Sequence, residues 1–190
     1  MTHPRFTDAS TIAPPAWVGN RRRALAALAA AGLGAVDARA QTPPRDEARA
    51  GPLPPLGTHI ELPELTLLDG SVLPPAATQG LVVVLYWWAS WCPFCAVQSP
   101  LMDRLRQAQH ARGLRLIGLS IDKKPEDALA YLQKRGYGFP SAWVTPAVER
   151  ALPKPKGLPV TVVLGRDRRV VMSEAGQLFP EDVDAIARFL

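Results

Sequence analysis

The hydrophobic pattern of this chain is organised around a continuous apolar stretch near its middle. Leu81 to Leu85 is a short run rich in Val that follows Gly80, and such a run is typical of a strand buried on both faces. The run continues through aromatic residues to the pair Cys92 and Cys95, with Pro93 directly after the first cysteine. Because proline suits the first turn of a helix, the sequence predicts a helix that begins at Cys92.

The segment after the cysteines has apolar residues at helical spacing. It predicts a helix that ends near Gly113, is kinked by the internal Pro100, and turns an apolar stripe toward the core. This stripe consists of Phe94, Val97, Leu101, Leu105 and Ala108.

The rest of the pattern alternates strands and helices. We expect a hairpin of 62–68 and 71–73 around the Asp69-Gly70 turn, a strand over 114–121, and a helix from Pro125 to Gly136. A strand over 160–164, an antiparallel return over 170–173 and a final helix from Pro180 follow. Strands and helices that alternate with short connections predict an α/β fold with a parallel part to its sheet.

The first forty residues have the layout of an export signal. Arg21, Arg22 and Arg23 precede a weakly hydrophobic run from Ala24 to Val36, and 38–40 reads Ala-Arg-Ala, an A-x-A cleavage site. The run is too short for a membrane span, which needs about 20 residues. The adjacent arginines resemble a twin-arginine signal. The alternatives are a cytosolic tail and an uncleaved membrane tether.

Composition and charge divide the chain further. Residues 41–57 form a Pro-rich linker, and we expect the folded domain to be 58–190. Five of the 22 basic residues and two of the 17 acidic residues precede Gln41, so the charge of +5 belongs mostly to the leader. From Gln41 onward no basic stripe with interleaved aromatics occurs, which argues against a nucleic-acid partner.

The two cysteines are the candidate chemistry. At a helix N-terminus the helix dipole stabilises an anion, so the pKa of the Cys92 thiol is expected to lie below about 8.5. Cys95 lies three residues on and can close a disulfide with Cys92. A four-residue ring stabilises a fold by only about 2 kcal/mol against ~4.7 for a hundred-residue loop, so a purely structural bond is disfavoured.

A metal site is the other interpretation of the cysteine pair. Zinc needs about four ligands, and His59 and His110 lack the usual short spacing, so no metal ligand set is predicted. A C-x-x-C pair after a buried strand instead matches a redox motif, with Cys92 the more exposed and attacking thiol and Cys95 the resolving thiol.

Polar residues follow the strand predicted at 114–121. Asp122, Lys123 and Lys124 lie past its carboxyl end, where α/β proteins place binding groups. We expect them either near the cysteines or in a solvated loop.

The segment from Trp87 to Cys95, WWASWCPFC, resembles the W-A-x-W-C-x-x-C active-site segment of thioredoxin-fold proteins. Pro100 matches the helix-kinking proline of that fold, and 158–161 (LPVT) looks like its cis-proline segment. The leader, hairpin and βαβ insert resemble exported TlpA/ResA-type thiol–disulfide oxidoreductases over 57–190. The resemblance implies a thioredoxin-like three-layer sandwich, a central mixed sheet with helices on both faces and an N-terminal β-hairpin.

The resemblance also implies roles for particular residues. Cys92 and Cys95 are the catalytic pair, with the redox-active disulfide in place of any cofactor. The client-binding residues implied are Trp91, Pro93, Phe94, Leu158 and Pro159.

Two positions depart from the family pattern. Tyr86 stands where thioredoxin has a buried Asp, and Gln98 stands where ResA-type proteins can carry a Glu. Neither acid is present to deprotonate Cys95, so we expect water or another base and a slow resolving step. Phe94 brings no charge between the cysteines, which favours a more reducing potential than that of a strong oxidant.

The sequence therefore predicts a periplasmic enzyme, cleaved after residue 40, that reduces disulfides in client proteins. A membrane-borne thiol reductant recharges it, and clients in cytochrome c maturation are implied by the resemblance alone. Two alternatives stay open: a Cu(I)-binding module that uses the same cysteines, and a disulfide-forming oxidant.

Overall fold

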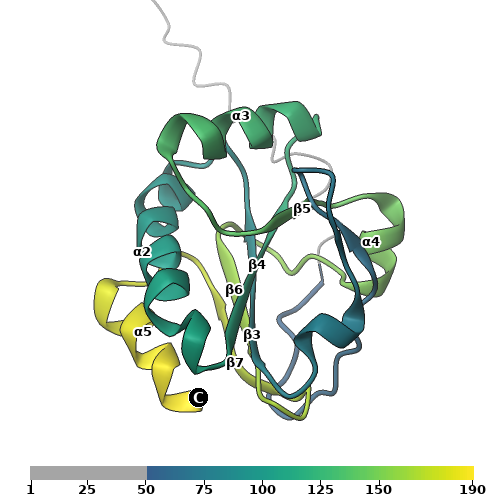
Figure 1. The fold of residues 1–190 in the computed structure, drawn as a ribbon, viewed down its shortest axis with the longest axis vertical. Helices are drawn as coiled ribbons and strands as arrows, with labels where there is room; N and C mark the ends of the chain where they lie inside the picture. Colours follow the sequence, from purple (N-terminus) through teal and green to yellow (C-terminus); the bar gives the residue numbers. More distant parts are fainter. Residues whose placement is uncertain (1–50) are drawn as a thin grey trace, which may run out of the picture. The chain divides into compact units, whose positions relative to one another are not determined.

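The computed structural model describes residues 51–190, and the predicted export signal lies outside this range. Its main element is a five-stranded sheet of order β5-β4-β3-β6-β7 (Figure 1). Strands β3, β4 and β5 run parallel, and β6 and β7 are antiparallel to their neighbours. The strands are β1 (Leu65–Thr66), β2 (Val72–Leu73), β3 (Val82–Trp88), β4 (Leu114–Ser120), β5 (Ser141–Trp143), β6 (Val160–Leu164) and β7 (Val170–Ala175).

The helices of the described range connect or follow these strands. They are η1 (Pro75–Thr78), α2 (Pro93–Gln109), η2 (His110–Arg112), α3 (Pro125–Arg135), α4 (Pro146–Ala151), α5 (Pro180–Ala185) and η3 (Ile186–Phe189). None of the helices in 51–190 is long and apolar enough to cross a membrane.

Strand β3 lies in the middle of the sheet, and all seven of its residues are buried. One face of β3, with Tyr86 and Trp88, packs in a cluster with residues of α2, α3 and α5. The other face, with Leu85 and Trp87, packs in a cluster with residues of α4 and the N-terminal strand pair. The expected central mixed sheet with helices on both faces is therefore confirmed.

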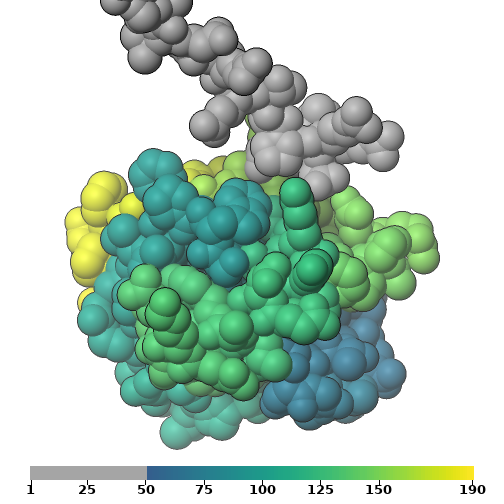
Figure 2. Space-filling view, turned by 90° about the horizontal axis from the view of Figure 1, so that it is seen from above, coloured from purple at the N-terminus to yellow at the C-terminus, as the bar shows by residue number. Residues whose placement is uncertain are grey.

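The end of the molecule that carries α3 is seen from above in Figure 2, where the green surface of α3 lies beside the teal surface of earlier residues. Beneath α3, Trp88 makes ring contacts with Tyr131 and Phe139 at centroid distances of 5.6 and 5.8 Å. These aromatic contacts join the carboxyl end of β3 to the α3 side of the core.

Several predicted boundaries shift in the structure. Strand β3 continues three residues past Leu85 to Trp88, because aromatic side chains also pack well in a strand. The first hairpin strand is only Leu65–Thr66, not 62–68, and Pro63, which cannot donate a hydrogen bond to a partner strand, lies before its start. The hairpin borders the β5 edge through a bridge between Leu67 and Ala142. The left-handed Gly113 and Gly136 end their helices as predicted.

The predicted apolar stripe of α2 is wrong at three positions. Phe94, Val97 and Ala108 are exposed, and Leu101 is only partly buried. The buried face is formed by Cys95, Gln98, Ser99, Met102, Asp103 and Leu105. The helix is rotated from the orientation that its hydrophobic residues favour, because its first turn must place Cys95 and Gln98 against the sheet.

The last residues of the predicted linker contact the domain. Gly51 forms a bridge with Pro155, and its carbonyl accepts a hydrogen bond from the Lys156 amide at 3.0 Å. The Gly57 amide donates to the Val170 carbonyl at 2.8 Å.

Gly118 of β4 provides a test of this packing. A Cβ at this position would overlap Ser141 Oγ and lie 2.8 Å from Trp88 Nε1 and 3.1 Å from Phe139 Cε2. We expect Gly118→Ala to lower the free energy of unfolding by about 1–3 kcal/mol, measured by chemical denaturation. Gly51→Ala is the matched control, because no atom lies within 4 Å of its added Cβ. Equal stability of the two variants would contradict this packing.

Candidate active site

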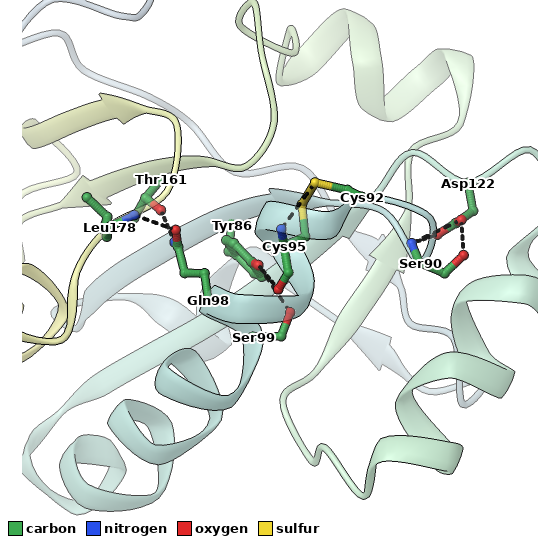
Figure 3. Close-up of a disulfide and its surroundings, with 9 residues drawn as sticks. All are labelled: Tyr86, Ser90, Cys92, Cys95, Gln98, Ser99, Asp122, Thr161 and Leu178. Atoms are coloured by element: carbon green, nitrogen blue, oxygen red, sulfur yellow. Dashed lines mark hydrogen bonds between the residues drawn. A yellow bond between two sulfur atoms is a disulfide. The ribbon is translucent and has the colours of Figure 1, made fainter. Parts of the chain in front are cut away.

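The two cysteines form a disulfide at the N-terminus of α2 (Figure 3). Cys92 is the N-cap residue, with extended backbone, and its sulfur accepts a hydrogen bond from the Cys95 amide at 3.2 Å. The Cα atoms are 5.2 Å apart, within the usual range for a disulfide. Pro93 occupies the first turn, as predicted. The Cys92 sulfur therefore lies at the positive end of a 17-residue helix.

Both cysteine side chains are largely covered in the disulfide form. Cys92 is 4% exposed and Cys95 is 1% exposed, so the expected order holds but the difference is small. The two bonded sulfurs shield one another, which reduces the open surface of each. The residues around them are not buried: Trp91 and Phe94 are 56% and 58% exposed, and Pro93 is also exposed. The disulfide thus lies at a helix terminus bordered by exposed apolar side chains.

Gln98 connects the cysteine helix to two other parts of the fold. Its side chain is fully buried, and its amide nitrogen donates to Thr161 Oγ1 of β6 at 3.0 Å. Its amide oxygen accepts the Leu178 backbone N–H at 2.7 Å, in the segment before α5. Figure 3 shows these contacts on one side of the disulfide. An amide can donate and accept at the same time, so Gln98 fixes the start of α2 against β6 and the C-terminal region.

Tyr86 lies beneath the first turn of α2. Its hydroxyl donates to the Cys95 carbonyl at 3.4 Å and lies 3.1 Å from Ser99 Oγ. Burial raises the pKa of Tyr86 well above its ordinary value of 10.0. The phenol therefore stays neutral at physiological pH and supplies no charge beside Cys95.

Asp122 binds the segment that leads into Cys92 from the opposite side (Figure 3). Its carboxylate accepts the Ser90 backbone N–H at 3.1 Å and the Ser90 hydroxyl at 2.6 Å. It also accepts the Ser120 hydroxyl at 2.8 Å. Lys123 and Lys124 are exposed. Two positions were predicted for this loop. Asp122 lies near the cysteine segment, whereas the two lysines lie in solvent.

Pro159 lies at the same edge of the sheet as the cysteine motif. In the antiparallel pairing of β3 with β6, Trp87 is opposite Val160, so Pro159 comes next to the carboxyl end of β3. The Leu158–Pro159 peptide bond is cis, an isomer that the sequence alone does not determine. Pro159 is buried, and Leu158 is half-buried against the cluster that contains both cysteines. The binding roles of these two residues stay predictions.

Metal ligands do not gather around the cysteines in residues 51–190. No group of three or more His, Cys, Asp or Glu side chains in this range is placed to hold a metal ion.

Three contacts of the site were not predicted from the sequence. They are the hydrogen bonds of Gln98 with Thr161 and with Leu178, and those of Ser90 with Asp122. The sequence does contain a signal for the burial of Gln98. The buried face of α2 follows the helical spacing of Cys95, Gln98, Met102 and Leu105, so Gln98 is a polar residue on that face. The other partners depend on contacts distant in sequence, for which no local signal exists.

Comparisons with known proteins agree with this geometry. A family model described as the AhpC/TSA family matches residues 59–171, more than half of the chain. The thiol:disulfide interchange protein HelX of Rhodobacter capsulatus is 28% identical over 138 residues, which cover 72% of this chain and 70% of HelX. The soluble secreted antigen MPT53 of Mycobacterium tuberculosis is 37% identical over 46 residues, 24% of this chain and 27% of that protein.

A solved structure shows the same fold. The thiol:disulfide interchange protein of the thioredoxin family from Chlorobium tepidum superposes with a TM-score of 0.63 at 22% identity, over 69% of this chain and 95% of that one. The expected thioredoxin-like fold is confirmed.

Gln98→Leu tests the buried bridge. The variant keeps the size of the side chain but leaves Thr161 Oγ1 and the Leu178 N–H without their partner, so we expect a loss of about 1–3 kcal/mol in the free energy of unfolding. Gln133→Leu, at an exposed position of α3, is the control and should change stability by less than about 0.5 kcal/mol. Similar denaturation midpoints for the two variants would refute the bridge.

Proposed function

The chain belongs to the AhpC/TSA family and is a thiol–disulfide oxidoreductase of thioredoxin fold. From this premise we propose that it reduces disulfide bonds in client proteins outside the cytoplasm. The observation that carries the proposal is the Cys92–Cys95 disulfide at the N-terminus of α2, next to exposed Trp91 and Phe94. A short-range disulfide on a helix terminus is a poor structural staple and a suitable redox pair.

The reaction requires two thiol–disulfide exchanges. In the reduced enzyme the Cys92 thiolate attacks a client disulfide, which forms a mixed disulfide and releases one client thiolate. The Cys95 thiolate then attacks the Cys92 sulfur, which closes the ring and releases the second client thiolate. Two electrons pass from the cysteine pair to the client, and each released thiolate takes up a proton.

The surroundings of the pair suit an extended client segment. Trp91, Pro93 and Phe94 supply exposed apolar surface beside Cys92, where apolar side chains that flank a client cysteine can pack. Leu158 and Pro159 lie at the neighbouring end of β6 and would help to position the client backbone.

Continuous turnover needs a source of electrons. A membrane-borne dithiol would return two electrons and two protons to the disulfide.

The export signal predicted over residues 1–40 supports a location outside the inner membrane. A similar protein, MPT53, is described by its name as secreted.

The absence of a positive charge between the cysteines supports a reductant. Pro93 and Phe94, the two residues between them, are uncharged. The helix N-terminus stabilises the Cys92 thiolate, but neither of these residues adds a cation to this effect. The reduced form is therefore not as favoured as it is in strong oxidants.

Replacing the resolving cysteine should trap the intermediate. In Cys95→Ser the mixed disulfide with Cys92 cannot be resolved, so we expect client proteins to accumulate as reducible adducts on non-reducing gels. Cys92→Ser is the matched control and should trap none. If Cys92→Ser traps as many adducts as Cys95→Ser, the assigned order of attack is wrong.

The direction of electron flow can be measured with glutathione. We expect the equilibrium potential of the full chain to be lower than about −180 mV, whereas strong oxidants lie near about −120 mV. The fraction of disulfide is followed by mass after thiol alkylation. A potential near that of the strong oxidants would favour the disulfide-forming alternative.

A further inference from the structure

Asp122 is a buried carboxylate beside the redox pair that the proposed reaction does not use. It is 3% exposed and follows β4, where the end of that strand lies next to the end of β3. Its oxygens accept hydrogen bonds from Ser90 and Ser120, and its backbone carbonyl accepts Trp143 Nε1–H at 2.7 Å. Ser90 is two residues before Cys92, so a negative charge is held against the segment that ends at the attacking sulfur.

Two of the other buried charges are bound elsewhere. In residues 51–190 the buried charged side chains besides Asp122 are Asp103, Lys154 and Arg168. Asp103 pairs with Arg106 further along α2, and Arg168 donates to Pro75 and Thr78. Asp122, by contrast, bonds Ser90 of the segment that leads into Cys92.

Other charged side chains lie around Asp122. Lys123, Glu149 and Lys154 share with Asp122 the lining of a cavity of about 360 Å³, and Lys154 Nζ donates to the Pro155 carbonyl at 3.0 Å. Lys123 and Glu149 are exposed, so solvent screens their charges. The first turn of α2 has no acidic residue, and Tyr86 beneath it is neutral.

We propose that the Asp122 carboxylate disfavours the Cys92 thiolate and thereby makes the Cys92–Cys95 pair a stronger reductant. The inference rests on the proposed function, because it requires Cys92 to be the attacking thiol. Reducing the disulfide adds two electrons and two protons, and at higher pH one thiol is left as a thiolate. A nearby negative charge raises the energy of that thiolate but not of the uncharged disulfide or thiol. Asp122 thus acts through charge and position and touches no reacting atom.

This electrostatic role has a pH signature. Below the pKa of the thiols both sulfurs are protonated in the reduced form, and the charge of Asp122 has little effect on the redox equilibrium. Above that pKa a thiolate is present, and the charge of Asp122 has its full effect on the redox equilibrium. A purely structural role, in which Asp122 only shapes the loop, would change the equilibrium constant similarly at both pH values.

The experiment compares glutathione redox equilibria of the full chain at pH 6 and pH 9. Asp122→Asn keeps an acceptor for the Ser90 N–H and removes the charge. We expect its equilibrium constant to shift toward the reduced form by about three- to tenfold at pH 9 and by less than about twofold at pH 6. The rate at which iodoacetamide alkylates Cys92 in the Cys95→Ser background, measured near neutral pH, should rise with the same substitution.

Ser90→Ala is the matched control, because it removes one hydrogen bond to Asp122 but keeps the carboxylate. It should match the wild type within about twofold at both pH values. Asp122→Ser is a second neutral variant with a small hydroxyl, and it should reproduce the pH 9 shift if Asp122→Asn does not fold.

The outcomes separate this inference from the proposed function. If the wild-type pair cycles with glutathione but both neutral Asp122 variants match it at pH 9, or shift equally at pH 6 and pH 9, the charge effect is refuted and the oxidoreductase stands. If the wild-type cysteines do not exchange with glutathione at all, the proposed function itself fails.

Discussion

The junction between the central strand β3 and helix α2 is the constraint on which this site depends. The strand is buried on both faces, so its carboxyl end is fixed, and the helix that starts five residues later must begin at that edge of the sheet. Two buried polar side chains, Gln98 and Asp122, hold the junction from opposite sides. A disulfide that opens and closes needs such a frame, because the two sulfurs must return to bonding distance after each exchange.

Opposing electrostatic effects meet at Cys92. The helix N-terminus stabilises a thiolate, which favours attack on a client disulfide. The buried charge of Asp122 acts in the other direction, and the neutral Tyr86 and Phe94 add nothing to either. A reductant needs both properties in moderation: enough thiolate to react, and a disulfide form stable enough to release the reduced client.

The exposed face of α2 shows how a functional site overrides the usual placement of apolar residues. Phe94 and Val97 are turned to solvent while Gln98 and Ser99 are buried, which costs apolar burial and requires a complete set of hydrogen bonds inside. This arrangement places apolar surface beside the disulfide, where clients bind in the proposed reaction. Departures from local patterns of this kind are expected at functional sites.

The sequence by itself determined strands β3, β4, β6 and β7 of the main sheet, the start of α2 at Cys92 and the pairing of the two cysteines, because these depend on local spacing, proline chemistry and a continuous apolar run. It did not predict the short edge strand β5 (Ser141–Trp143). It did not determine which face of α2 is buried, the cis isomer at Pro159, or the contacts of Gln98 and Asp122. Their partners are 32 to 80 residues away along the chain, so only the folded arrangement brings them together. Long-range pairing of polar groups leaves no periodic trace in a sequence.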